Sequence, residues 1–158
     1  LIMPKVTIRR VTKSDTDFIL NLLLSLMDPE LPNWRDAEVM LDIDQRILKA
    51  EIEEGNKDNA IFIAEDAQDQ QRLGFIFLEI GTDYYHREPH GHIADIIVAP
   101  EARGRGIGKM LMQKAEEWTK DCGYSLLTLN VFDDNKKARK LYQSLGFTPD
   151  LTKYGKIL

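Results

Sequence analysis

The fold is decided by one stretch, Ile96-Ile97-Val98-Ala99-Pro100-Glu101-Ala102-Arg103-Gly104-Arg105-Gly106-Ile107-Gly108-Lys109. An apolar strand runs into a turn with glycine at every second position, and the turn opens a helix expected over 107–121. The first N–H groups of a helix have no intrahelical partner and lie at the positive end of its dipole. Glycine lets a ligand approach such a backbone closely. With a net charge of +2 over Glu101–Lys109, the turn predicts a phosphate-binding site.

Two common nucleotide motifs do not fit this turn. A Walker A loop ending at Gly108-Lys109 requires glycine at 103 and a hydroxyl at 110, where the chain has Arg103 and Met110. A dinucleotide fingerprint starting at Gly104 requires glycine at 109, where the chain has Lys109. A phosphate ligand would therefore belong to another class, and the alternative is a glycine-rich turn between strand and helix that binds nothing.

Outward from this turn, hydrophobic periodicity predicts one mixed α/β (α+β) domain over residues 4–158, without repeats or linkers. The polar run 66–72 is expected to be a hairpin connection, and 81–91 a loop. The expected strands are 5–11, 60–64, 73–80, 92–98 and 126–132, with a last strand over 147–157. The expected helices are 14–26, ended by Pro29 and Pro32, then 39–55, 107–121 and 135–145.

Composition excludes several classes of protein. The chain has 158 residues, 43% of them hydrophobic, and its net charge of −5 argues against a nucleic-acid binder. The lone Cys122 forms no internal disulfide, and no apolar run is long enough to span a membrane, so we expect a cytoplasmic protein. A homodimer is compatible with the sequence.

A second motif follows in the C-terminal part, Asn135-Lys136-Lys137-Ala138-Arg139-Lys140-Leu141-Tyr142-Gln143-Ser144-Leu145-Gly146-Phe147. With the Arg-x-x-Gly-x-Gly turn at 103–108, it resembles the GNAT superfamily of N-acetyltransferases over about 92–149. The resemblance implies a mostly antiparallel central sheet flanked by helices, with two splayed parallel central strands. It also implies an acyltransferase that moves an acetyl group directly from acetyl-CoA to a primary amine of a small molecule or peptide.

The resemblance assigns the acetyl-CoA site residue by residue. The pyrophosphate is expected on the amides of the glycine turn, and the pantetheine arm along the backbone of the preceding strand. Asn135 is expected near the pantetheine, and it also suits the N-cap of its helix. The implied cofactor-binding residues are Ile96, Ile97, Val98, Arg103, Gly104, Arg105, Gly106, Ile107, Gly108, Lys109, Asn135, Ala138 and Tyr142.

The resemblance implies that Tyr142 is the general acid for the departing thiolate. The alternative is that Tyr142 is only an aromatic residue of the hydrophobic core. The general base is where the sequence departs from the family pattern, because Ala94 occupies the position of the usual glutamate. His92 shares the expected face of Ala94, and Glu79 lies on the neighbouring strand, so both are candidate bases beside a water chain. Strand alternation turns Asp95 to the opposite face, where we expect a structural role.

Three further features have a functional and a structural interpretation. Four potential metal ligands lie close in sequence: His86, Glu88, His90 and His92. Their Pro-Gly loop disfavours a metal site, and no metal is expected. In the same loop, Tyr84 and Tyr85 are expected to contact the acceptor. Residues 28–58 carry ten acidic and four basic side chains, either a solvated helix face or a wall that attracts a cationic amine. Cys122 is expected to be a buried apolar residue rather than a nucleophile.

Two alternatives to acetyl transfer stay open. One is an acyl-CoA-binding module without catalysis, which the substitution at Ala94 favours and Tyr142 disfavours. The other is transfer of a longer acyl group, which depends on space beside Ile96 and Leu129. The sequence does not identify the acceptor amine.

Overall fold

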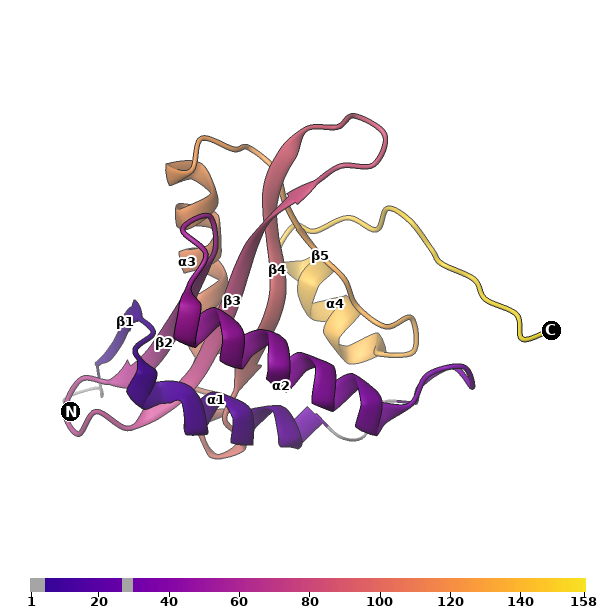
Figure 1. The fold of residues 1–158 in the computed structure, drawn as a ribbon. Coiled ribbons are helices and arrows are strands. Elements are labelled where there is room, and N and C mark those ends of the chain that lie inside the picture. Colours follow the sequence, from indigo (N-terminus) through magenta and orange to yellow (C-terminus); the bar gives the residue numbers. More distant parts are fainter. Residues whose placement is uncertain (1–4, 27–29) are drawn as a thin grey trace.

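The computed structural model describes residues 5–26 and 30–158 (Figure 1). Three residues named above lie outside the described residues. They are Pro4, where the expected domain begins, Asp28 in the acidic run, and Pro29 at the expected end of a helix. In the described part, no helix has both the length and the apolar character needed to cross a membrane.

The centre of the molecule is a five-stranded sheet with the order β1-β2-β3-β4-β5. All neighbouring strands are antiparallel except β4 and β5, which are parallel. The mixed, mostly antiparallel sheet is thereby confirmed. The strands are β1 (Val6–Arg10), β2 (Ala60–Asp66), β3 (Arg72–Thr82), β4 (Pro89–Val98) and β5 (Leu127–Leu129).

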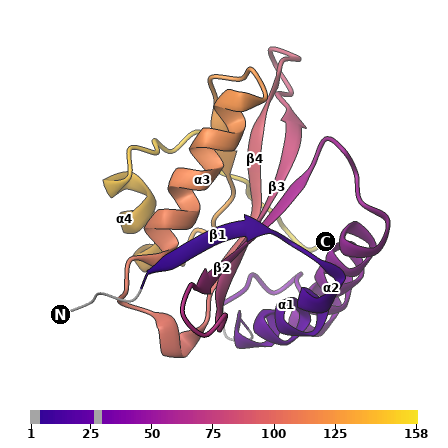
Figure 2. The ribbon, with the colours of Figure 1, turned by 90° about the vertical axis from the view of Figure 1, so that its left-hand side faces the viewer.

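Helices cover both faces of the sheet (Figure 2). On one side lie α1 (Thr16–Leu23) and α2 (Ala37–Glu54), and on the other α3 (Ile107–Asp121) and α4 (Lys136–Ser144). The Asp36 carboxylate caps α2 by accepting from two backbone N–H groups, and Gly55, with φ of 66°, follows its last turn. Short 3-10 helices span Lys13–Asp15, Leu24–Leu26 and Pro100–Ala102.

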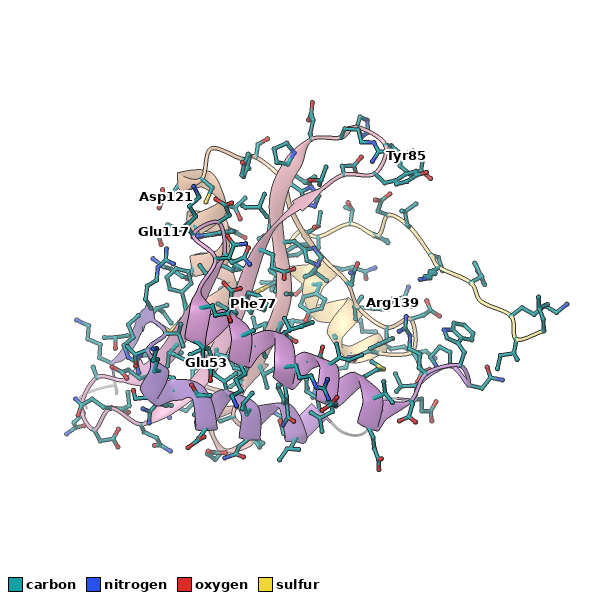
Figure 3. The ribbon with its side chains drawn as sticks, in the orientation of Figure 1. Glu53, Phe77, Tyr85, Glu117, Asp121 and Arg139 are labelled. Atoms are coloured by element: carbon teal, nitrogen blue, oxygen red, sulfur yellow. The ribbon has the colours of Figure 1, made fainter. Side chains whose placement is uncertain are left out.

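The core lies between the sheet and these helices. Phe75 and Phe77 of β3 are fully buried, as are Leu23 of α1 and Leu48 of α2. Figure 3 labels Phe77, which appears behind α2 in that view. On α3, the buried residues Ile107, Leu111 and Ala115 recur every four positions, so one stripe of the helix packs on the sheet.

A buried carboxylate joins β1 to β3. Both oxygens of Asp15, whose side chain is fully buried, accept from the guanidinium of Arg9 at 2.8 Å, and Arg72 donates to Oδ1 at 2.6 Å. The backbone N–H of Thr12 donates to Oδ2 at 2.8 Å. Burial raises the pKa of Asp15, but these hydrogen bonds outweigh burial and hold the pKa well below its usual range. The network fixes the start of α1 against the sheet.

Several expected boundaries were wrong. Residues 147–157 form no strand, and the C-terminal segment runs outward past β5 as an irregular chain (Figure 1). In the described part, β5 therefore lies at the sheet edge rather than at its centre. The expected loop at 81–91 is shorter than predicted and spans 83–88, because Gly81 pairs with His90 and Thr82 with Pro89 as continuations of β3 and β4.

Candidate functional site

A β-bulge in β4 sets the geometry of the site. Glu79 pairs with His92 and Leu78 with Ile93, but the next pair is Phe77 with Asp95, so Ala94 is an extra residue. Paired residues share a face of the sheet, and Phe77 and Glu79 are two apart on β3. His92 and Asp95 therefore lie on the same face. The expectation that Asp95 faces away from His92 was wrong, because the bulge resets the alternation.

The parallel strands separate directly after this bulge. β5 pairs with β4 only at Gly91, His92 and Ile93. From Ala94 to Val98, β4 has no partner on its β5 side among the described residues, whereas its other edge stays paired with β3. This is the splay that the resemblance implied. It leaves a backbone edge at which an extended ligand can form strand-like hydrogen bonds.

The glycine turn at the end of β4 has unpaired N–H groups. Gly104 and Gly106 have φ of 78° and 77°, which favour glycine, and a Cβ at either position would meet no atom within 4 Å. The N–H of Arg103 donates to Pro100 O and that of Met110 to Gly106 O. In the described part of the chain, the N–H groups of 104–109 have no backbone acceptor. The turn is thus an open set of donors at the start of α3, as a phosphate site requires.

Arg105 joins this turn to the end of β2. Its guanidinium lies 3.6 Å from Oδ2 of Asp66, which is almost buried. The other carboxylate oxygen of Asp66 accepts from the backbone N–H of Gln68 at 2.8 Å. Arg103 and Lys109 are exposed at the turn. The ion pair with Asp66 thus holds Arg105 at the turn.

The second motif forms α4 and its cap. The side chain of Asn135 accepts from the N–H of Ala138 at 3.2 Å, so its N-cap role is confirmed. Tyr142 is half-buried and contacts Phe147 edge to face, with ring centroids 6.1 Å apart. Burial raises the pKa of the Tyr142 hydroxyl, which therefore stays protonated at neutral pH.

Three carboxyl groups occupy the α2 side of the sheet near the bulge: Asp44 of α2, Glu79 of β3 and Asp95 of β4. Burial raises the pKa of all three. Glu51 adds to the rise for Glu79, and for Asp95 the nearby Asp44 and Glu79 bring the pKa to about 7. Among the described residues, no hydrogen bond or ion pair joins these carboxyl groups to a cation. Sequence reasoning missed Asp95 because nothing local signals the bulge.

His92 lies on the same face of the sheet, opposite Glu79. Its Nδ1 lies 2.8 Å from the hydroxyl of Thr128 on β5. Burial and then the neighbouring His90 lower the pKa of His92, so the ring is neutral at pH 7. Of the sequence-predicted bases, the structure thus brings Glu79 and His92 together as a cross-strand pair.

The remaining candidate residues have other contacts. His86 Nδ1 lies 3.1 Å from Asp83 in the β3–β4 turn, and within the described ranges no group of three potential ligands could hold a metal ion. Tyr84 and Tyr85 are exposed in the turn of this hairpin, and Figure 3 shows Tyr85 near its tip. Cys122 is exposed, so its expected burial was wrong. Partial burial and Asp121 raise the pKa of its thiol, which argues against an activated nucleophile.

A cavity of about 630 Å³ lies elsewhere, with Arg10, Phe62, Lys114 and Trp118 in its wall. None of the sequence-predicted site residues lines it. The candidate site is therefore the open edge between β4 and β5, together with the glycine turn and the cluster on the α2 side.

Comparisons with known proteins agree with this geometry. The family model for the acetyltransferase (GNAT) family matches residues 20–147. A thialysine N-epsilon-acetyltransferase from Sus scrofa is 31% identical over 95% of this chain and 88% of its own length. An aminoglycoside N(6')-acetyltransferase type 1 from Stenotrophomonas maltophilia is 28% identical over 89% of this chain and 85% of its own length.

Other matches are partial or structural. The chain spans only 35% of a Bos taurus thialysine N-epsilon-acetyltransferase and 37% of a Rhodococcus jostii mycothiol acetyltransferase. A putative acetyl transferase from Pyrococcus furiosus has a TM-score of 0.73 and 25% identity, over 98% of this chain and 100% of its own. An aminoglycoside N-acetyltransferase solved with CoA has a TM-score of 0.71 and 24% identity, over 98% and 97%. By the family model and the full-length relatives, the chain belongs to the GNAT family of acetyltransferases.

Proposed function

We propose that this chain transfers an acetyl group from acetyl-CoA directly to a primary amine of a cationic small molecule or peptide. The observation that carries the proposal is the free edge of β4 from Ala94 to Val98, which leads straight into the unpaired amides of 104–109. An extended arm ending in a pyrophosphate fits this arrangement. The net positive charge of the turn favours the phosphates.

Acetyl-CoA supplies a thioester, whose C–S bond breaks as the amine forms the new C–N bond. An alkylammonium with pKa of about 10 must first lose a proton, and His92 or Glu79 is the acceptor in this proposal. Tyr142, protonated at neutral pH, donates a proton to the departing sulfur. A thiol of pKa about 8.5 is a good leaving group, so transfer is faster with this proton donation but does not require it.

The acceptor class follows from charge. Asp44, Glu79 and Asp95 are partly buried carboxyl groups without a cation of their own in the described part of the chain, so a cationic substrate would offset the cost of burying them. The names of two full-length relatives, for thialysine and aminoglycoside acetylation, point to cationic amines as well.

CoA release from acetyl-CoA tests this function, with a panel containing a lysine analogue, an aminoglycoside, a polyamine and a peptide with a free N-terminus. We expect release that depends on the amine and is fastest with a polycation. If acetyl-CoA raises the unfolding temperature but no amine releases CoA, the chain is an acyl-CoA-binding module instead. Longer acyl-CoA donors in the same assay measure acyl-chain preference.

Tyr142→Phe tests the general acid. We expect kcat to fall by about 10- to 100-fold while the KM for acetyl-CoA changes less than about 3-fold, because the ring keeps its packing against Phe147. Tyr154→Phe is the matched control, since Tyr154 is 90% exposed on the C-terminal segment. An unchanged kcat in Tyr142→Phe would remove Tyr142 from the mechanism.

A further inference from the structure

Thr128 and His92 face each other across the parallel pair of strands, one row before the strands separate. The imidazole Nδ1 lies 2.8 Å from the Thr128 hydroxyl oxygen. The same hydroxyl donates to the carbonyl oxygen of Gly91 at 3.5 Å. Side chain and backbone of β4 thus both contact one hydroxyl of β5.

The proton inventory of this contact links the tautomer of His92 to the direction of the Thr128 hydroxyl. A hydroxyl has one hydrogen and two acceptor lone pairs. If the hydrogen of Thr128 is directed to Gly91 O, the hydroxyl oxygen accepts from Nδ1–H of His92. A neutral imidazole with hydrogen on Nδ1 has its lone pair on Nε2. In free histidine in water the opposite tautomer predominates, so this direction of the Thr128 hydroxyl would reverse the usual preference.

We propose that Thr128 is a positioning residue that holds His92 in the Nδ1–H tautomer, so that Nε2 accepts the proton of the acceptor amine. This rests on the proposed acetyl transfer and narrows its base from two candidates to one. The ammonium N–H bond breaks, its proton goes to Nε2, and the freed nitrogen lone pair attacks the thioester carbon. As the C–S bond breaks, Tyr142 protonates the departing sulfur, and the nitrogen loses a second proton, which restores the hydroxyl of Tyr142. His92 becomes an imidazolium with both nitrogens protonated and returns the proton to water.

The surroundings suit a transient positive charge on His92. Glu79 lies directly opposite on β3, and Asp95 follows the bulge on the same face. His90 on β4 is the titratable group that opposes the charge, while α2 adds Asp44 and Glu51 around the carboxyl groups. β5 contributes the uncharged Thr128. Burial and His90 lower the pKa of His92 and keep its ring neutral, and a carboxylate on the same face would stabilise the imidazolium that forms during transfer.

The tautomer can be measured directly by ¹⁵N NMR of the histidine rings. The chain has three histidines, and His92→Gln identifies the signals of His92. We expect the Nδ1–H pattern in the wild type and in Thr128→Ser, which keeps the hydroxyl. Thr128→Val keeps the shape without the hydroxyl and is expected to show mainly the Nε2–H pattern. An Nε2–H ring in the wild type would overturn the proposal.

Kinetics separate positioning from a merely structural role. Thr128→Val is expected to lower kcat by about 10-fold with the KM for acetyl-CoA unchanged, and Thr128→Ser to restore most of it. In Thr128→Val the acid limb of the kcat/KM profile should move to lower pH, because the imidazolium loses a hydrogen-bond acceptor. An unchanged kcat and profile in a folded Thr128→Val protein would refute the role. If the wild type releases no CoA with any amine, the proposed function fails, whereas the NMR result still decides the tautomer.

Discussion

Asp15 and Asp95 are two partly or fully buried carboxyl groups with opposite surroundings. Asp15, at the start of α1, has two guanidinium partners and a backbone N–H. Asp95, beside the bulge of β4, faces other carboxyl groups, and the described residues supply it with no cation. The pKa of Asp15 is held far below its usual range, while burial and its acidic neighbours raise that of Asp95 to about 7. The carboxylate of Asp15 stabilises the fold. Asp95 has no positively charged partner among the described residues, and the proposed cationic substrate would supply one.

The largest change in the free energy of unfolding is expected from a substitution at Asp15. Asp15→Asn leaves Arg9 and Arg72 without their shared anion and should lower the free energy of unfolding by about 4 kcal/mol at pH 7. Because the pKa of Asp15 is depressed, its contribution is present above the unfolded value of about 3.9 and is lost as pH falls below it. Urea unfolding at pH 7 and pH 3 measures both.

Asp42→Asn is the control for this measurement. Asp42 pairs with Arg46 at 3.0 Å on the exposed face of α2, so its loss should cost less than about 0.5 kcal/mol. Equal losses for Asp15→Asn and Asp42→Asn would contradict the distinction between buried and exposed pairs.

Asp95 should show the opposite pH dependence. Its folded pKa of about 7 exceeds the unfolded value of about 3.9, so the folded protein binds more protons between these values and stability falls as pH rises through that window. Asp95→Asn should remove about 2 kcal/mol of this fall, since Asp44 and Glu79 still titrate. Unfolding curves at pH 4, 6 and 8 test the sign. A variant less stable than the wild type at pH 8 would show that Asp95 has a stabilising partner.

Among the three buried or partly buried carboxyl groups, the smallest effect on stability is expected at Asp66, whose surroundings are intermediate between those of Asp15 and Asp95. Its ion pair with Arg105 is long, at 3.6 Å, and Asp66→Asn keeps an oxygen for the backbone N–H of Gln68. We expect a loss below about 1 kcal/mol in urea unfolding. A loss above 2 kcal/mol would mean that Asp66 fixes the glycine turn as Asp15 fixes α1.

The sequence by itself determined the features that depend on neighbouring residues. The glycine turn at 103–108 and the cap at Asn135 are local backbone geometries, which a short motif specifies. The order of strands and helices up to α4 also follows from local periodicity. Those local motifs sufficed to predict the family, and the proposed acetyl-CoA site rests on them as well.

Only the tertiary structure decided which side chains meet. The bulge at Ala94 puts Asp95 on the same face of the sheet as His92. A one-residue shift in register exchanges the faces of a strand, so no local pattern reveals this arrangement. The partners of Asp15 and His92 include residues 57 and 36 positions away. Their contacts depend on strand pairing, and so do the edge position of β5 and the absence of a strand over 147–157. Strand pairing depends on segments that are far apart in the sequence, whereas a turn or a helix cap depends on residues within one segment.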